Sequence, residues 1–356
     1  MRWLILKVIG TLGRFTVLPL IGVAVLLLAA WGAALDAKPI YAIAAVPLVF
    51  LLIVISGALF LGMFYAGLRS PPGPFATRAE APGLWRMWDE LSPPRWWQLR
   101  RLRLDDNFNA SIGQRSRLLG LALPETTMTF GLPMLQALDE PMVRAVVAHE
   151  VGHDACRHTV GLSNIIEFER ALYEVFESFP PHTTVTGSVL FGLLGRLGDW
   201  LKTEELRLSR VTEHEADAVA AKAIGRDAFA ASLAVFSASA ERYKTDFVTA
   251  AHDNLVQLLH VPPSPLERLL AEPKRPSADD LKRYAEVAYA MPHDPASTHP
   301  VLSESLTAIG VTSLPTLPEP GPSALTALLT PDVVAKLMKI YRQRWERYVS
   351  HYLQLG

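Results

Sequence analysis

Two histidines four residues apart, His149 and His153, lie in the stretch AVVAHEVGHDACRH, and Glu150 directly follows the first. On a helix, residues four apart share one face, so both imidazoles can bind one ion. Glu150 then lies beside that face, where its carboxylate can reach a water on the ion without being a ligand. Imidazole and carboxylate ligands in tetrahedral geometry favour zinc. The spacing therefore predicts a zinc site for hydrolysis. The alternative is an amphipathic helix that matches this motif by chance.

A third ligand is available in a second charged stretch, RVTEHEADAVA, at 210–220. Glu213 and Asp217 are four apart and share a helical face. A catalytic zinc with two histidines and one glutamate leaves a position for water, so we expect Glu213 to be this ligand. Asp217 can then hold the second nitrogen of a ligand imidazole. If Glu213 faces the ion, its neighbours His214 and Glu215 cannot. The alternative is a solvated charged helix.

The elements that must position these residues are mostly helices. Asp139 and Pro141 are typical of a helix start, and valines at helical spacing give the segment to His158 one apolar side. Further helices are predicted near 203–223, 278–289 and 330–353. Short strands are predicted at 99–104 and 126–130, with a turn at 105–110. The sequence thus favours a mainly α fold with a small β-sheet, in the α+β class.

The N-terminus contains two long segments without charge. Residues 15–35 and 40–68 comprise 21 and 29 uncharged residues, and about 20 suffice for a helix to cross a membrane. The short link between them permits only a tight turn. We therefore predict a transmembrane hairpin at 1–68. The segment 183–201 is apolar but contains Arg196 and Asp199, which favours an interfacial or partly buried helix over a third crossing.

Basic residues predict the orientation of this hairpin. Arg2, Lys7 and Arg14 precede the first span, a series of arginines follows the second, and Lys38 stands alone in the turn. The rule that cytoplasmic flanks are basic places everything after residue 68 in the cytoplasm. A bacterial source would make this the cell inner membrane. The alternative, a cleaved signal peptide over the first span, would leave the later domain on the same side.

Composition restricts the partners and the compartment. The net charge is −1, so no nucleic acid or other polyanion is expected as a partner. Cys156 is the single cysteine, which excludes an intramolecular disulfide and agrees with a reducing compartment. The expected partners are the lipid bilayer and a protein or peptide substrate; the sequence does not define an oligomeric state. Predicted domains are the hairpin at 1–68, a Trp- and Pro-rich juxtamembrane linker at 69–98, the metallopeptidase domain at 99–310, and a Pro-rich linker with an amphipathic helix at 311–356.

The chain resembles the integral-membrane gluzincin peptidases, the family of the type 1 CAAX prenyl protease and the bacterial heat-shock protease HtpX. HEVGH at 149–153, followed by RH, and SRVTEHEAD at 209–217 carry the resemblance together. DNFNA at 106–110 and STHP at 297–300 also match, less specifically. The resemblance implies a zincin-like fold, a membrane-anchored zinc metalloendopeptidase and a role in membrane-protein quality control.

The resemblance also implies roles for individual residues. His149, His153 and Glu213 would bind one zinc ion per chain, and Asp217 would orient a ligand. Glu150 would be the general base and acid. His299 would stabilise the tetrahedral intermediate; the alternative is an ordinary loop histidine. The strand at 126–130 would be the edge strand that pairs with an extended substrate.

The chain departs from the family's pattern in two places. The family often has an arginine six residues after the THP histidine, and here this residue is Ser305. Members similar to HtpX usually have two more spans between the zinc motifs, where this chain has only 183–201. Ser305 removes one expected part of the transition-state apparatus. The small number of spans leaves no counterpart for the chamber of the prenyl protease, which argues against prenyl-protein processing.

Two other functions are compatible with the motif. A metal-binding but inactive membrane scaffold, or a chaperone-like protein, would have no need of Glu150, although Ser305 weakly favours it. A structural zinc site usually has four closed positions with cysteine ligands, and Cys156 is the only cysteine. The peptidase is therefore the leading hypothesis.

Overall fold

The structure is a computed structural model that describes residues 2–37, 39–68, 73–117, 122–160, 162–255 and 261–355. It divides into two compact units, each assembled from three segments of the chain. Unit 1 comprises Met1–Pro71, Gln114–Glu125 and Arg157–Ser209, and unit 2 comprises Pro72–Gly113, Thr126–Cys156 and Arg210–Gly356. Helices predominate, with one small four-stranded sheet, which confirms the predicted α+β class.

Unit 1 consists mainly of helices. Its elements are α1 (Arg2–Leu12), η1 (Gly13–Thr16), α2 (Val17–Ala37), α3 (Pro39–Ala44), α4 (Val46–Leu68), α8 (Leu162–Ser178) and the first part of α9 (Val185–Ile224). Apolar residues recur every three or four positions along α8, from Leu162 to Val175. They pack with Ile9 and Leu201 into this unit's core, as expected for one apolar face of an amphipathic helix.

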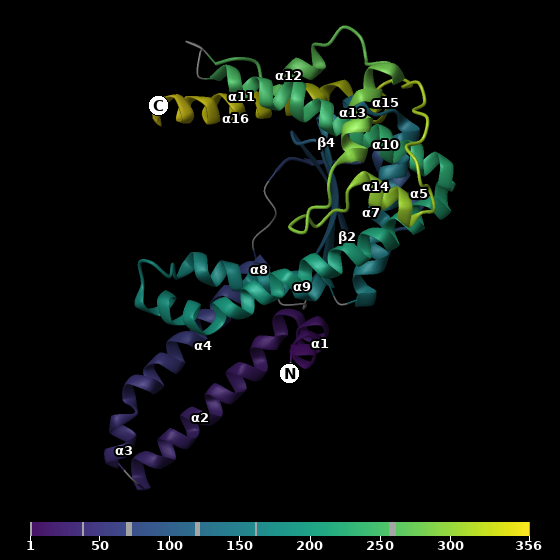
Figure 1. Cartoon of the computed structure of the whole chain (residues 1–356). Coiled ribbons are helices and arrows are strands. Elements are labelled where there is room, and N and C mark those ends of the chain that lie inside the picture. The colour runs from purple at the N-terminus through teal and green to yellow at the C-terminus, as the bar shows by residue number, and fades with distance from the viewer. Residues whose placement is uncertain are drawn as a thin grey trace. The chain divides into compact units, whose positions relative to one another are not determined.

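The two N-terminal segments without charge are helical. Helices α2 and α4 pack against each other as a hairpin connected through α3 (Figure 1). The Trp31 indole N–H donates to the Ala42 carbonyl at 2.8 Å and fastens the end of this hairpin, whereas Lys38 of the predicted turn lies outside the described residues. Within the part of the chain that the structure describes, no helix has the combination of length and apolarity that a membrane crossing requires. The helical hairpin is thus confirmed, and its crossing of a membrane is not.

Unit 2 contains most of the sheet and the remaining helices. Its elements, some of whose ends are assigned to unit 1, are β1 (Phe75–Ala76), α5 (Pro82–Leu91), β2 (Leu99–Asp105), β3 (Ala110–Arg117), β4 (Ala122–Gly131), α6 (Leu132–Ala137), α7 (Glu140–Val160), α10 (Arg226–Arg242), η3 (Tyr243–Thr249), α11 (Ala250–Leu255), α12 (Pro265–Leu270), α13 (Ala278–Ala290), α14 (Leu302–Ala308), α15 (Ala324–Leu328) and α16 (Pro331–Leu355). The strand order is β1-β2-β4-β3, and β1 runs antiparallel to β2 with Phe75 opposite Arg103. The predicted strands at 99–104 and 126–130 are found as β2 and β4.

The core of unit 2 contains two of the four tryptophans in the segment 69–98. Trp85 and Trp88 stack at 5.4 Å and are buried in the core with side chains of β2, α6 and α7. The indoles of Trp96 and Trp97, in the following loop, are exposed. The predicted linker at 69–98 therefore contributes side chains to the core of unit 2.

Two details of the predicted arrangement are wrong. The segment 183–201 and the charged helix near 203–223 form one continuous helix, α9, because neither proline nor a turn sequence separates them. Strand β4, which was expected to be the edge strand for substrate, lies between β2 and β3. Strand β3, which was not predicted, lies next to β4 at the end of the sheet. Its sequence, ASIGQRSR, is polar and contains glycine, so it lacks the usual strand signal.

Helices α7 and α9 approach each other closely at Gly152. A Cβ atom there would lie 2.9 Å from the Cα of Ala216 and 3.2 Å from its Cβ, so no larger residue fits without a shift. At Gly131, the end of β4, a Cβ would meet the Asn107 carbonyl oxygen, which fixes the DNFNA turn against the strand. Both glycines thus allow close packing around the residues of interest.

Replacement of Gly152 by alanine should force α7 and α9 apart. We expect a loss of about 1–3 kcal/mol of unfolding free energy, because overpacking displaces the backbone of Ala216. Thermal unfolding of the purified protein measures this. Gly192→Ala is the matched control on α9, since a Cβ added at this glycine would have no neighbouring atom within 4 Å; it should be neutral or stabilising by up to about 1 kcal/mol. Equal effects of the two substitutions would contradict the close approach.

Candidate active site

The first half of the site is fixed by the start and the buried side of α7. The Met142 N–H donates to the Asp139 carboxylate at 3.0 Å, which caps the helix as the sequence predicted. Val143 and Val147 are fully buried in the core of unit 2. This burial sets the rotation of α7, and with it the face on which the two histidines lie.

Three donor atoms from α7 and α9 meet in a small triangle. His149 Nε2 lies 3.1 Å from His153 Nε2 and 3.4 Å from Glu213 Oε2, and His153 Nε2 lies 3.4 Å from Glu213 Oε1. A tetrahedral zinc ion with ligand distances of 2.0–2.2 Å has donor atoms about 3.3–3.6 Å apart. The structure thus brings together the three predicted ligands at a spacing that fits one metal ion, and they form one potential metal site.

The ring of His149 is held on two sides. Its Nδ1 atom lies 2.9 Å from Asp217 Oδ1, and Asp217 is almost completely buried. Phe229, from α10, lies nearly parallel to the imidazole at 6.4 Å between ring centroids. With Nδ1 directed at Asp217, Nε2 is left for an ion, which is the placement that the predicted role of Asp217 requires.

The charges at the site favour a cation. Burial alone would lower the pKa of His149, but its contacts with Asp217 and Glu213 and the charge of Glu150 outweigh burial and raise this pKa to about 10. Burial would raise the pKa of Glu213, yet contacts with His149, His153 and His299 hold it well below its usual range. Without metal, the site therefore contains ionised Glu213 beside protonated His149.

Glu150 and His299 lie at a cleft next to the triangle. The cleft has a volume of about 350 Å³, and both residues line it together with His149, Glu213 and Asp217. Glu150 is buried, whereas 72% of the His299 side chain is exposed. His299 Nδ1 lies 2.8 Å from Glu213 Oε1, and this contact raises the pKa of His299 despite the opposing effect of partial burial. The structure thus places His299 at the same cleft as Glu150, in contact with Glu213.

Neighbouring residues of the motif lie elsewhere. His214 and Glu215 are not members of the potential metal site found among the described residues. Glu215 instead contacts Cys156 and contributes, after burial, to a raised pKa of that thiol. Ser305 is buried and lines the cleft where the family often has arginine.

Sequence reasoning gave no role to several cleft residues. Asn109 and Ala110, at the start of β3, line the cleft, and the Asn109 Oδ1 atom is buried without a hydrogen-bond partner. Phe229, Leu233 and Phe236 supply an apolar wall from α10. The resemblance of DNFNA to the family pattern was the one available signal for Asn109; the residues of α10 carry no motif.

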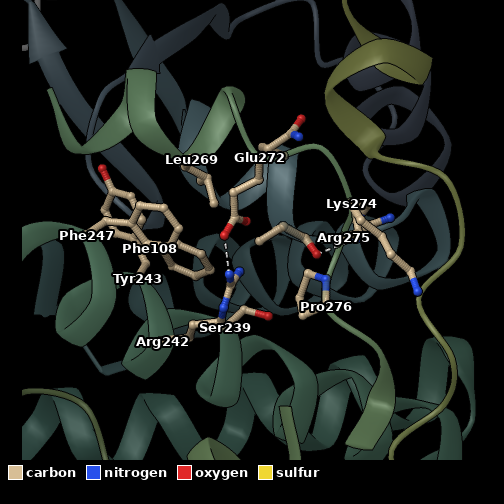
Figure 2. A pocket seen from close by; sticks show the side chains of 12 residues that line it. Phe108, Ser239, Arg242, Tyr243, Phe247, Leu269, Glu272, Lys274, Arg275 and Pro276 are labelled. Carbon is tan, nitrogen blue, oxygen red and sulfur yellow. Dashed lines mark hydrogen bonds and ion pairs between the residues drawn. The ribbon is translucent and has the colours of Figure 1, made fainter. Parts of the chain in front are cut away.

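A second, much smaller cavity lies elsewhere in unit 2. Its volume is about 20 Å³, enough for about one water molecule. Phe108, Tyr243 and Phe247 form one wall, and an ion pair between Arg242 and Glu272 lies at another (Figure 2). This cavity is too small for a peptide. The cleft at Glu150 is the candidate active site because His149 and Glu213 of the donor triangle line it.

Two histidines and a glutamate beside a free carboxylate are the site type of H-E-x-x-H metallopeptidases. Comparison with known families agrees: the model of peptidase family M48 matches residues 108–311. This range is more than half of the chain and includes every residue of the site, and the chain belongs to peptidase family M48, the metallopeptidase family of the type 1 CAAX prenyl protease and HtpX. Searches of curated proteins and of solved structures gave no match.

Metal binding should displace the proton from His149. Because the pKa of this residue is about 10 without metal, the affinity should rise about tenfold per pH unit above neutrality. Competition with a chelator at pH 6.5, 7.5 and 8.5 measures the apparent Kd for zinc. Asp217→Asn removes a contact that raises the pKa, so this variant should show a shallower dependence. An affinity independent of pH would mean that His149 is already neutral.

Proposed function

We propose that this chain is a zinc metalloendopeptidase in which His149, His153 and Glu213 hold one zinc ion. The observation that supports it best is the triangle of donor atoms, 3.1–3.4 Å on each side, beside the buried carboxylate of Glu150. Bound zinc supplies Lewis acidity, which activates water and polarises a scissile carbonyl. Family membership makes the substrate a protein or peptide.

Glu150 is proposed as the group that moves the proton. It follows a ligand histidine in α7 and lines the cleft without joining the metal triangle. Its carboxylate accepts the proton of the attacking water and then transfers it to the leaving amine, so one residue is base and acid in turn. Burial keeps bulk water away from this exchange.

His299 is proposed to stabilise negative charge that develops on the carbonyl oxygen. It lines the cleft beside Glu213, with its Nδ1 atom 2.8 Å from Glu213 Oε1, and an imidazole N–H can donate a hydrogen bond to such an oxygen. Asp217 has a different role, because its contact with Nδ1 orients the ring of the proposed ligand His149. The short side chain of Ser305 carries no charge, so it cannot stabilise a developing negative charge as the family's arginine would.

The substrate backbone is proposed to lie along β3. This strand is at one end of the sheet order, and its first residue, Ala110, lines the cleft. An extended peptide can add to such an edge as a further strand. Apolar side chains of α10 then favour an apolar substrate residue next to the scissile bond.

Glu150→Gln should abolish turnover and leave metal binding intact. Loss of the general base lowers kcat by about 10²–10⁴-fold, whereas the three ligands are unchanged. Cleavage of fluorescein-labelled casein and zinc content per chain are measured on the same detergent-purified sample. Glu213→Ala is the control with the opposite signature, since it should lose both zinc and activity. A Glu150→Gln variant that cleaves like the wild type would overturn the proposed mechanism.

The same variant separates the peptidase from a metal-binding scaffold or chaperone-like protein, which Ser305 weakly favours. A scaffold would keep its biological activity without Glu150. The buried position of Glu150 in the cleft supports the enzyme, because a carboxylate that is neither a ligand nor exposed has no evident purpose in a scaffold.

Membrane anchoring and a cytoplasmic active site are a further part of the proposal. The helical hairpin exposes many large apolar side chains, among them Leu26, Leu48 and Phe50, each about 70% exposed. Apolar surface of this extent normally has an apolar partner, and lipid is the partner that the basic flanks indicate. A function in membrane-protein quality control would follow from this location.

The orientation can be tested with single cysteines in a Cys156→Ser background. In intact cells, Asp36→Cys in the hairpin turn should react with a membrane-impermeant maleimide. Asp332→Cys, at the exposed start of α16, should react only after lysis. The full chain should also remain with membranes after alkaline carbonate extraction. Labelling of Asp332→Cys in intact cells would contradict a cytoplasmic active site.

A further inference from the structure

His299 lies in the irregular segment 291–301 between α13 and α14. This loop has a few local bonds. The Ala296 N–H donates to the Asp294 carboxylate at 2.9 Å, and the Ser297 hydroxyl donates to the His299 carbonyl at 2.8 Å. These bonds shape the turn, but they do not attach it to the helix that carries Glu213.

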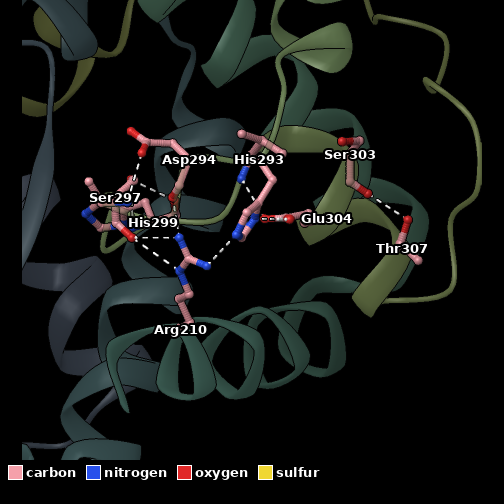
Figure 3. A network of polar contacts seen from close by, with 10 residues as sticks. Arg210, His293, Asp294, Ser297, His299, Ser303, Glu304 and Thr307 are labelled. Atoms are coloured by element: carbon pink, nitrogen blue, oxygen red, sulfur yellow. Dashed lines mark hydrogen bonds and ion pairs between the residues drawn. The ribbon is translucent and has the colours of Figure 1, made fainter. Parts of the chain in front are cut away.

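Arg210 makes that attachment (Figure 3). Its Nε and one terminal nitrogen each donate to the Ser297 carbonyl at 3.3 Å, and the same terminal nitrogen donates to the Asp294 carbonyl. The other terminal nitrogen lies 2.8 Å from His293 Nε2. One guanidinium therefore contacts three residues of the loop that carries His299.

The partner of Arg210 in this loop is itself fixed. Since a guanidinium only donates, His293 Nε2 must accept, and its Nδ1 then donates to Glu304 Oε1 at 2.6 Å. The second oxygen of Glu304 accepts the Val301 N–H at 3.3 Å and caps α14. The chain of contacts from Arg210 thus ends on the helix that follows His299.

Arg210 lies one turn before Glu213 on α9. One helix therefore carries both a proposed metal ligand and the arginine that holds the loop. The cleft adds a second reason for accurate placement. Among its described lining residues there is no lysine or arginine, and Ser305 stands where the family often has arginine. His299 is therefore the residue of this cleft that is left to neutralise a developing charge.

The geometry points to Arg210 as a positioning residue that holds the 291–301 loop, so that His299 meets Glu213 at the mouth of the cleft. Its effect on turnover rests on the proposed peptidase function, whereas its hold on the loop does not. Lysine cannot replace it, because a single ammonium lacks the planar set of donors that spans two carbonyls and an imidazole.

Hydrogen–deuterium exchange of the full-length protein tests the hold on the loop without any substrate. Arg210→Ala should increase exchange of peptides covering 291–301 and leave α7 unchanged. Arg207→Ala is the matched control: it lies one turn earlier on α9 and pairs with Glu204 at 2.8 Å, so the loop should exchange as in the wild type. Unchanged loop exchange in Arg210→Ala would overturn the inference.

Cleavage of labelled casein tests whether Arg210 acts through His299. Arg210→Ala should lower kcat by about ten- to a hundredfold, with KM and zinc content little changed, and Arg210→Lys should not restore it. In a His299→Ala background the same substitution should cause no further loss. Additive losses would overturn the inference. A wild type that binds zinc but never cleaves would instead refute the proposed function, and the exchange experiment would still decide on Arg210.

Discussion

The contact between α7 and α9 at Gly152 and Ala216 is the constraint on which the site depends. Each helix supplies only part of the potential metal site: two imidazoles come from α7 and a carboxylate comes from α9. Side chains of ordinary length reach a common point only if the two backbones nearly touch. The glycine in HEVGH makes this approach possible, since even one methyl group would meet the backbone of Ala216 at 2.9 Å. The spacing of the donor atoms is thus a consequence of helix packing as much as of residue choice.

The charges are arranged around that contact in a way that suits a cation. Glu150, Glu213 and Asp217 are buried within a short distance of two imidazoles, and the pKa of His149 rises to about 10 to balance them. Buried carboxylates without a counter-charge are costly, so the site without metal recruits protons in place of an ion. An ion at the triangle would allow both histidines to be neutral and would still compensate the acids.

Helical periodicity explains which parts of the fold and of the candidate site could be predicted from the sequence. His149 with His153, and Glu213 with Asp217, are pairs four apart, so their shared faces follow from sequence alone, and so do the boundaries of α7, α13 and α16.

Features that depend on contacts across the fold were harder to predict from the sequence. Strand β3 is polar and shows no alternation, and the prediction of β4 as the edge was wrong because strand order is set by pairing. The length of α9 was missed because a helix can continue through glycines when its sides pack. The apolar wall from α10 has no motif at all.

His299 shows the same limit at the level of one residue. Its sequence context, a loop between prolines, allowed either a functional or an ordinary histidine. What the structure adds is the contact of this loop with Arg210, which is three residues before Glu213 and more than 80 residues before the loop. Arg210 and Glu213 lie on the same helix in the same unit. A small shift of that helix would therefore move the loop with it and keep the His299–Glu213 contact at 2.8 Å. In the proposed mechanism, a site without the family's arginine gains most from such a coupling, because movement of the loop would carry His299 away from the substrate carbonyl.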